Sequence, residues 1–98
     1  MVEVRKTQLF EDWFVALRDR QARLRIQVRI DRLSFGNSGQ HRVLTGGVYE
    51  MKIDYGPGYR VYYTKHADAW VLLLCGGDKA SQRADIKAAQ ALAKELEQ

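Results

Sequence analysis

Apolar residues recur at steps of three and four in two successive segments near the start of the chain, a spacing typical of amphipathic helices. In the first segment they are Leu9, Phe10, Trp13, Phe14 and Leu17. In the second they are Ala22, Ile26, Ile30 and Leu33. Thr7 can cap the first helix, and the second begins near Asp19 or Arg20. Gly36 in "FGNSG" suits the left-handed position after a helix. We therefore expect a helical hairpin, preceded by a first strand in "VEVRKT".

From Arg42 onward the period changes to two, as in strands. "VYEMKI" (48–53) and "YRVYYT" (59–64) alternate, and Pro57 with its glycine neighbours in "DYGPGY" favours a turn between them. "KHAD" predicts the next turn, and "WVLLLC" (70–75) is apolar enough for a central strand covered on both faces. A last helix follows the glycine pair of "CGGDK", with Asp78 or Ser81 as its cap.

This order of segments predicts one α+β domain over residues 1–98, with one strand, two helices, three or four strands and a final helix. Short connections make the small, twisted sheet mainly antiparallel. The helical hairpin should pack on one face of the sheet. The other face should carry Lys52, Arg60 and Tyr62 and be at least partly open.

The net charge is +4, and its distribution tells more than its sum. Six arginines lie between residues 18 and 32, and Arg25, Arg29 and Arg32 form one line along the second helix. Such a stripe predicts an anionic partner, either nucleic acid or an acidic protein segment, although a solvated helix face gives the same pattern. Cys75, in an apolar run, is expected to be a buried and unreactive thiol.

Several classes of protein are excluded. His41 and His66 are far apart in sequence and have no second cysteine or acidic cluster at ligand spacing, so no metal or other cofactor is expected. "GPGY" and "CGGDK" match neither a P-loop nor a dinucleotide-binding fingerprint. No signal-like or membrane-spanning apolar stretch is present, which predicts a soluble cytoplasmic protein.

A set of cationic and phenolic side chains remains as the candidate chemistry. Lys52 and Arg60 project from adjacent strands of one hairpin and can reach a single phosphate. Tyr62 could stack on a base or donate to a phosphate. Further polar residues lie where the last strand gives way to the last helix, a place that favours anions. They are Lys79, Ser81 and Arg83. Spacing alone predicts anion binding, and a solvated strand face is the plain alternative.

Three stretches carry a resemblance to a known family. "RIDRLSFGNSG", "GGVYEMKIDYGPGYRVYY" and "LLLCGGDKASQRADIKAAQALA" resemble the small toxins of the RelE superfamily, in its HigB-like branch of addiction-module killer proteins. The resemblance runs from about residue 10 to about residue 93. It implies metal-independent, ribosome-dependent cleavage of messenger RNA. It also implies an antitoxin, typically a helix-turn-helix protein from the adjacent gene, through which the complex binds operator DNA.

Residue by residue, the arginine of the family's "GYR" motif corresponds to Arg60, the basic residue of the preceding strand to Lys52, and that after the last strand to Lys79. These groups would stabilise the charge that builds up when an RNA 2′-hydroxyl attacks the adjacent phosphate. Lys52 could alternatively act as the base. The arginine line on the second helix would contact ribosomal RNA backbone.

The chain departs from the family in its last turns. Many relatives have a catalytic tyrosine or histidine there, whereas "QALAKELEQ" has none. The general acid and base are therefore unassigned; Tyr62 and His66 are substitutes by elimination, and His41 is a weaker one. Lys52 also stands where relatives often have arginine. The alternative function is a non-catalytic relative that binds an antitoxin or nucleic acid.

Overall fold

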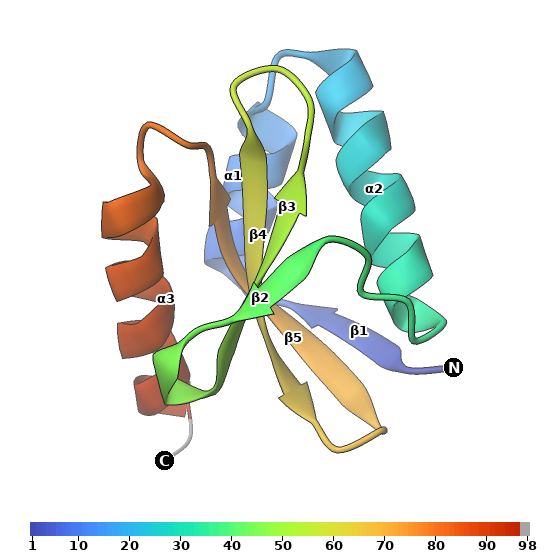
Figure 1. Ribbon diagram of the computed structural model, residues 1–98, viewed down its shortest axis with the longest axis vertical. Helices are drawn as coiled ribbons and strands as arrows, with labels where there is room; N and C mark the ends of the chain where they lie inside the picture. The colour runs from blue at the N-terminus through green and yellow to red at the C-terminus, as the bar shows by residue number, and fades with distance from the viewer. Residues whose placement is uncertain (97–98) are drawn as a thin grey trace.

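The computed structural model describes residues 1–96, and its elements follow the predicted order. They are β1 (Glu3–Lys6), α1 (Gln8–Ala16), α2 (Arg20–Ser34), β2 (His41–Val43), a 3-10 turn η1 (Thr45–Gly47), β3 (Val48–Ile53), β4 (Tyr59–His66), β5 (Trp70–Gly77) and α3 (Gln82–Leu96). This arrangement confirms the α+β fold, with four strands after the helical pair (Figure 1).

The five strands form one twisted sheet in the order β1-β5-β4-β3-β2 (Figure 1). β1 pairs with β5 in parallel, and the other three pairings are antiparallel. The predicted "DYGPGY" turn joins β3 to β4, with positive φ at Gly56 (56°) and Gly58 (80°). This turn sets the register in which Lys52 lies opposite Arg60 and Glu50 lies opposite Tyr62.

Helices cover both faces of the sheet. α1 and α2 pack on one face against alternate residues of the strands, as the pattern predicts. Its buried residues include Phe10, Ile26, Ile30, Met51, Tyr59, Val61, Tyr63 and Leu73. α3 packs on the opposite face, mainly over β5 and β4. The buried residues there are Val48, Tyr62, Leu74, Cys75, Ala89 and Ala93.

The expectation of a partly open face is therefore correct only for part of the sheet. α3 covers its central strands, including Tyr62, which is 0% exposed. The β2–β3 edge beside α3 stays accessible, since Arg42 is exposed and Lys52 is half-buried there.

The ends of the first two helices are fixed by the predicted residues. Thr7 Oγ1 accepts the N–H of Phe10 at 3.0 Å, and Asp19 accepts the N–H groups of Gln21 and Ala22. α2 ends in a Schellman motif, in which Gly36 has φ 87° and two N–H groups after the helix return to Arg32 and Leu33 carbonyls. These caps satisfy backbone groups that have no partner within the helix.

The glycine pair of "CGGDK" lets both helical layers approach β5 closely. A Cβ at Gly76 would overlap the ring of Trp13 on α1, and a Cβ at Gly77 would overlap the Asp85 carboxylate on α3. The motif therefore holds α1 and the first turn of α3 against the same strand end. It does so next to Lys79, whose N–H donates to the carbonyl of Pro57 in the β3–β4 turn at 3.4 Å.

Candidate functional site

A polar cleft lies where β2, β3 and β4 meet the first turn of α3. Its volume is about 360 Å³. The lining residues are Gln40, His41, Arg42, Glu50, Lys52, Arg60 and Gln82. Strand alternation places Glu50, Lys52 and Arg60 on this face. The cleft thus gathers basic side chains from three strands around one carboxylate.

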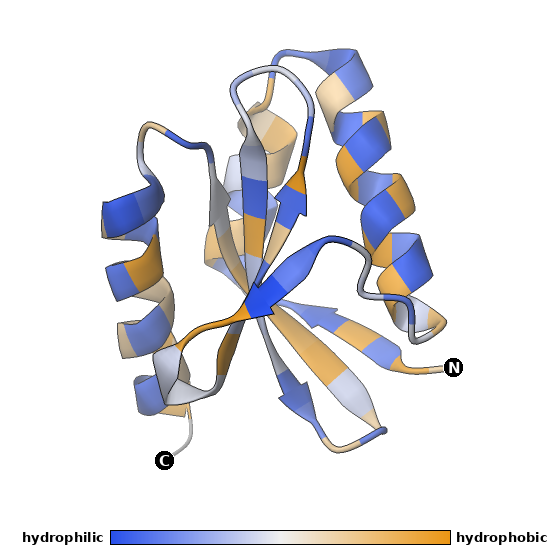
Figure 2. Cartoon of the chain, in the orientation of Figure 1, coloured by the Kyte–Doolittle hydropathy of each residue, from blue (hydrophilic) through white to orange (hydrophobic). Residues whose placement is uncertain are grey.

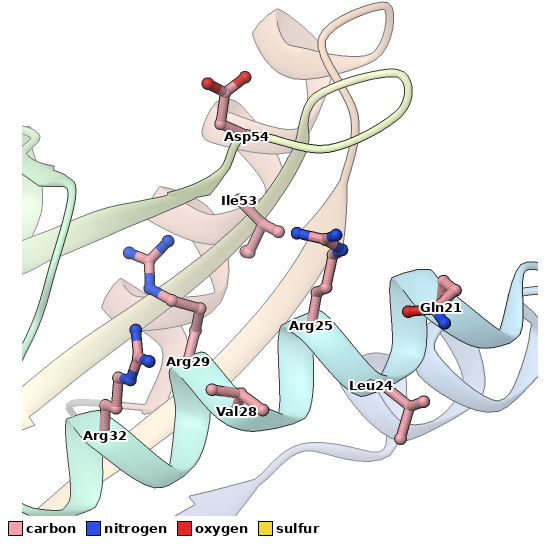
Figure 3. Close-up of a pocket in the computed structure, with 8 residues that line it drawn as sticks. All are labelled: Gln21, Leu24, Arg25, Val28, Arg29, Arg32, Ile53 and Asp54. Carbon is pink, nitrogen blue, oxygen red and sulfur yellow. The ribbon is translucent and has the colours of Figure 1, made fainter.

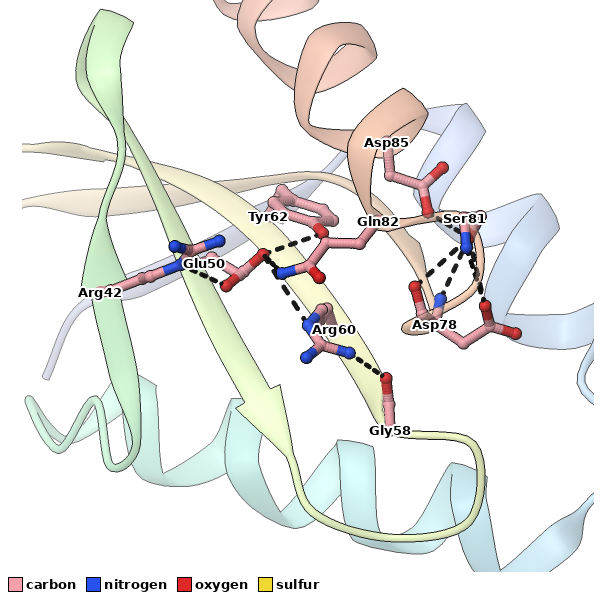
Figure 4. Close-up of polar contacts among 9 residues, drawn as sticks. All are labelled: Arg42, Glu50, Gly58, Arg60, Tyr62, Asp78, Ser81, Gln82 and Asp85. Atoms are coloured by element: carbon pink, nitrogen blue, oxygen red, sulfur yellow. Dashed lines mark hydrogen bonds and ion pairs between the residues drawn. The ribbon is translucent and has the colours of Figure 1, made fainter.

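Glu50 is the centre of the hydrogen-bond network on the floor of the cleft (Figure 4). Its Oε1 accepts from Arg42 Nε at 2.7 Å, and its Oε2 accepts from Tyr62 Oη and Gln82 Nε2, both at 3.0 Å. The residue is 4% exposed. A buried carboxylate needs such compensation, because an unpaired charge in the interior is very costly.

Arg60 lies beside Glu50 and is only 6% exposed. Its Nη1 donates to the carbonyl of Gly58 at 2.7 Å, while its Nε is 3.9 Å from Glu50 Oε2 (Figure 4). That Nε is buried and has no hydrogen-bond partner. A buried donor without a partner destabilises a protein, and such groups in native structures often mark functional sites. Arg60 is therefore held in place between Gly58 and Glu50 at the floor of the cleft.

Hydrogen bonding sets the charge states of the carboxylate and the phenol. Burial alone would raise the pKa of Glu50, but hydrogen bonds from Arg42, Gln82 and Tyr62 outweigh it and hold that pKa below its usual value. Burial, followed by the nearby charge of Glu50, raises the pKa of Tyr62 far above its usual value. At neutral pH Glu50 is thus a fixed anion and Tyr62 a fixed hydrogen-bond donor. Neither is suited to exchange protons with a ligand.

The cleft continues along the first two turns of α3. A neighbouring hollow of about 400 Å³ shares Arg42 and Gln82 with it. Arg83, Ile86, Lys87 and Gln90 complete its lining. We call the two hollows together the basic groove. Five cationic side chains line it against the single carboxylate of Glu50. An extended, multiply charged anion fits this arrangement better than a small neutral ligand.

The structure brings together some of the predicted site residues. Lys52 and Arg60 line the groove from paired strand positions, and Arg83 lines its α3 end. Lys79 is exposed and its Cβ lies near Gly58, at the same end as Arg60. Ser81 precedes the first residue of α3, and its hydroxyl bonds to Asp85 at 2.5 Å and to Asp78 (Figure 4).

Three predicted contacts do not agree with the structure. Tyr62 cannot stack on a base, because α3 buries its ring. His66 lies at the opposite end of β4 from Arg60, about 20 Å away by the rise per residue of a strand, and stacks on Trp70. Arg29 is not available to RNA, because its guanidinium donates to the carbonyls of Lys52, Ser38 and Gln40.

The other two arginines of this line remain exposed, but not in the groove. Arg25 and Arg32 line a separate cleft between α2 and the end of β3 (Figure 3). Any partner that they contact therefore binds on the α2 side, away from Arg60.

Sequence reasoning missed several groove residues, among them Arg42, Glu50, Gln82 and Lys87. For Glu50 a signal existed, because strand alternation places it on the face of Lys52, where α3 could cover it. Arg42 and Gln82 had no comparable signal, since their approach depends on how β2 and α3 pack against β3.

Among residues 1–96 no group of three or more His, Cys, Asp or Glu side chains could hold a metal ion. No helix of this part of the chain is long and apolar enough to cross a membrane.

Comparisons with known proteins give the family and the fold. An uncharacterized protein of Haemophilus influenzae is 43% identical over 95 residues, covering 97% of this chain and 96% of that protein. The chain belongs to the same family as this protein. No protein-family model matches it. The solution structure of the conserved hypothetical protein HP0894 from Helicobacter pylori is similar, with a TM-score of 0.58 and 15% identity, covering 82% of this chain and 97% of that one. This likeness concerns the fold alone.

Proposed function

We propose that the protein is the toxin of a type II toxin–antitoxin system and an endoribonuclease that cleaves messenger RNA on the ribosome, in the cytoplasm. The observation that carries the proposal is Arg60, held by Gly58 and Glu50 at the floor of a groove that four further cationic side chains line. The sequence resemblance to RelE-superfamily toxins of the HigB-like branch supplies the reaction. Its motif residues Arg60 and Lys52 face each other across one hairpin.

The groove suits the charge changes of RNA cleavage. When the 2′-hydroxyl attacks the neighbouring phosphate, negative charge builds on the phosphate oxygens. Arg60 would bind that charge from a site poor in water, and Lys52 and Lys79 would add to it from the same end of the groove. Glu50 touches no substrate in this scheme. It is a positioning residue that keeps Arg60 and Arg42 oriented.

The rest of the groove would hold the RNA strand beyond the scissile bond. Arg42, Arg83 and Lys87 line this part of the groove. Phosphate contacts of this kind position a strand without selecting its sequence. In this proposal the ribosome presents the message, and an antitoxin from another gene neutralises the protein and links it to operator DNA.

A non-catalytic RNA-binding module is the second candidate, and one observation favours it. Glu50 and Tyr62, the acid and the phenol nearest Arg60, are both fixed in one protonation state at neutral pH.

Of the two histidines, His41 lines the groove and His66 does not. His41 Nδ1 contacts the carbonyl of Gly39 at 2.8 Å, so the neutral ring would carry its proton there and leave Nε2 free. His41 is therefore the better of the two histidine candidates for proton transfer.

To test the proposal, expression of the protein is induced in bacteria, and growth and the cleavage of messenger RNA are measured. The wild type is compared with Arg60→Lys, which keeps the charge but loses the planar fork, and with the exposed control Lys65→Ala. We expect arrest and new 5′ ends inside translated regions with the wild type and the control. Arg60→Lys should lower the cleavage rate about 10²–10³-fold.

Two results would decide against the enzyme. Intact messages with soluble wild-type protein would contradict the toxin proposal. RNA binding that depends on Arg60 without any cleavage on ribosomes would favour the binding module. Circular dichroism of the purified variants verifies that each has folded.

A further inference from the structure

The outer side of α2 combines exposed apolar residues with arginines. Leu24 is 55% exposed and Val28 is 46% exposed, and a spacing of four places them side by side on the helix. Phe35, at the end of the same helix, is 72% exposed. Figure 2 shows hydrophobic and hydrophilic bands alternating along α2. Single exposed apolar residues need no explanation, but several on one helix indicate an interaction surface.

A shallow cleft of about 390 Å³ runs beside these residues, between α2 and the end of β3. In Figure 3 the side chains of Arg25, Arg29 and Arg32 extend from the helix toward β3, while those of Leu24 and Val28 point away from it. The cleft thus has an apolar side and a basic side. We call Leu24, Val28, Arg25 and Arg32 the α2 surface.

Two of the three arginines have charge to offer. Arg29 is occupied by backbone carbonyls and fixes the β2–β3 edge. Arg25 lies over the ring of Tyr55 with its guanidinium carbon 4.6 Å from the ring centroid, which orients it without neutralising it. Within residues 1–96, neither Arg25 nor Arg32 forms an ion pair. Both charges therefore remain for a partner.

We propose that the α2 surface is the docking site for an acidic amphipathic helix of another protein. Such a helix would place apolar residues on Leu24 and Val28 and carboxylates on Arg25 and Arg32. Arginine is well suited to such carboxylates, because its guanidinium forms charge-assisted, bidentate hydrogen bonds with them. The docked helix would present its own apolar anchors at steps of three and four.

Two other occupants fit less well. A nucleic-acid backbone offers no apolar group to cover Leu24 and Val28, and Arg29 is already occupied. A second copy of this chain would bring a net charge of +4 against an equally basic surface. The α2 surface also lies across the sheet from the face that bears Glu50 and Arg60. The docking proposal and the proposed function can therefore fail independently of each other.

Amide chemical-shift mapping tests the docking proposal. The probe is a synthetic peptide of about 20 residues, long enough to be helical, with leucines at steps of three and four and glutamates beside them. A scrambled peptide of the same composition and a short single-stranded RNA are titrated in parallel. We expect the amphipathic peptide to shift amides of α2 and to bind at least about tenfold more tightly than the scrambled one. The RNA should leave those amides unmoved.

Two pairs of variants sharpen the result. Leu24→Ser/Val28→Ser should weaken peptide binding about tenfold or more, whereas Leu9→Ser/Val15→Ser, two exposed apolar residues of α1, should leave it unchanged. Arg25→Ala/Arg32→Ala should weaken it similarly, and the exposed pair Lys65→Ala/Lys94→Ala should not.

Equal binding of the scrambled peptide, or shifts outside α2, would overturn the proposal. RNA-induced shifts in α2 would assign the surface to nucleic acid instead. Concentration-dependent α2 shifts without any peptide would assign it to a second copy.

Discussion

The two faces of the sheet are both buried, but by different means. The face under α1 and α2 is filled with apolar and aromatic side chains, among them Phe10, Ile26 and Tyr63. The face under α3 has a smaller apolar core and, beside it, a buried network around Glu50. The first face supplies most of the hydrophobic stabilisation. The second holds polar groups in fixed positions, which costs stability and prepares a binding site.

The largest effect on stability should come from the apolar face. Phe10 is 1% exposed and stacks on Phe14 with 5.8 Å between ring centroids. Phe10→Ala should lower the free energy of unfolding by about 3–5 kcal/mol, because it removes buried area and leaves a cavity. Urea unfolding followed by tryptophan fluorescence measures this. Leu9→Ala, at an exposed neighbouring position, should change it by less than about 0.5 kcal/mol. Equal effects at both positions would contradict this account of the face.

The next effect concerns the contact between β5 and α3. Gly77→Ala places a methyl group where the Asp85 carboxylate lies, so that side chain must move and lose its bond to Ser81. We expect a loss of about 1–3 kcal/mol in the same unfolding experiment. Asp85→Ala makes room, so the double variant should regain part of the loss. If the losses of Gly77→Ala and Asp85→Ala simply add in the double variant, the overlap with the Asp85 carboxylate is not the cause of the loss in Gly77→Ala.

The β3–β4 turn and the packing of α3 show what the sequence could and could not predict. The turn at Pro57 and the direction of Arg60 followed from local chemistry, because glycine, proline and alternation act within a few residues. The burial of Tyr62 could not be predicted, since alternation assigns a face but not what covers it. That depends on Gly77, whose lack of a side chain lets α3 approach. The position of His41 in the groove likewise depends on β2, a strand of three residues.

The polar face should respond to pH where the apolar face does not. The pKa of Glu50 is lower in the folded protein than its usual value, so its contribution to stability is complete above that value, about 4.3, and is lost as the pH falls through the folded pKa. Glu50→Gln should lower stability by about 1.5–3 kcal/mol at pH 7. Its difference from the wild type should shrink below about pH 4.

Glu95→Gln is the matched control, because Glu95 is exposed. It should change neither the stability at pH 7 nor the pH profile. A constant difference between wild type and Glu50→Gln from pH 7 to pH 3 would show that the Glu50 network acts through packing rather than charge. The variant also bears on function, since Arg60 would then lose an oriented partner while keeping its bond to Gly58.

The smallest effect on stability should come from the rim of the basic groove, where the effect on binding is expected instead. The Arg42 side chain is 56% exposed and buried Glu50 keeps its bonds from Tyr62 and Gln82, so Arg42→Ala should cost about 1 kcal/mol. If its free nitrogens contact an RNA phosphate, the variant should bind single-stranded RNA more weakly. The slope of log affinity against log salt should also fall by about 0.7. Arg32→Ala removes another exposed arginine, from the α2 surface, and should leave that slope unchanged. A smaller slope in Arg32→Ala but not in Arg42→Ala would show that RNA binds on the α2 side of the sheet and not on the α3 side. The proposed role of Arg60 in binding RNA would then be wrong.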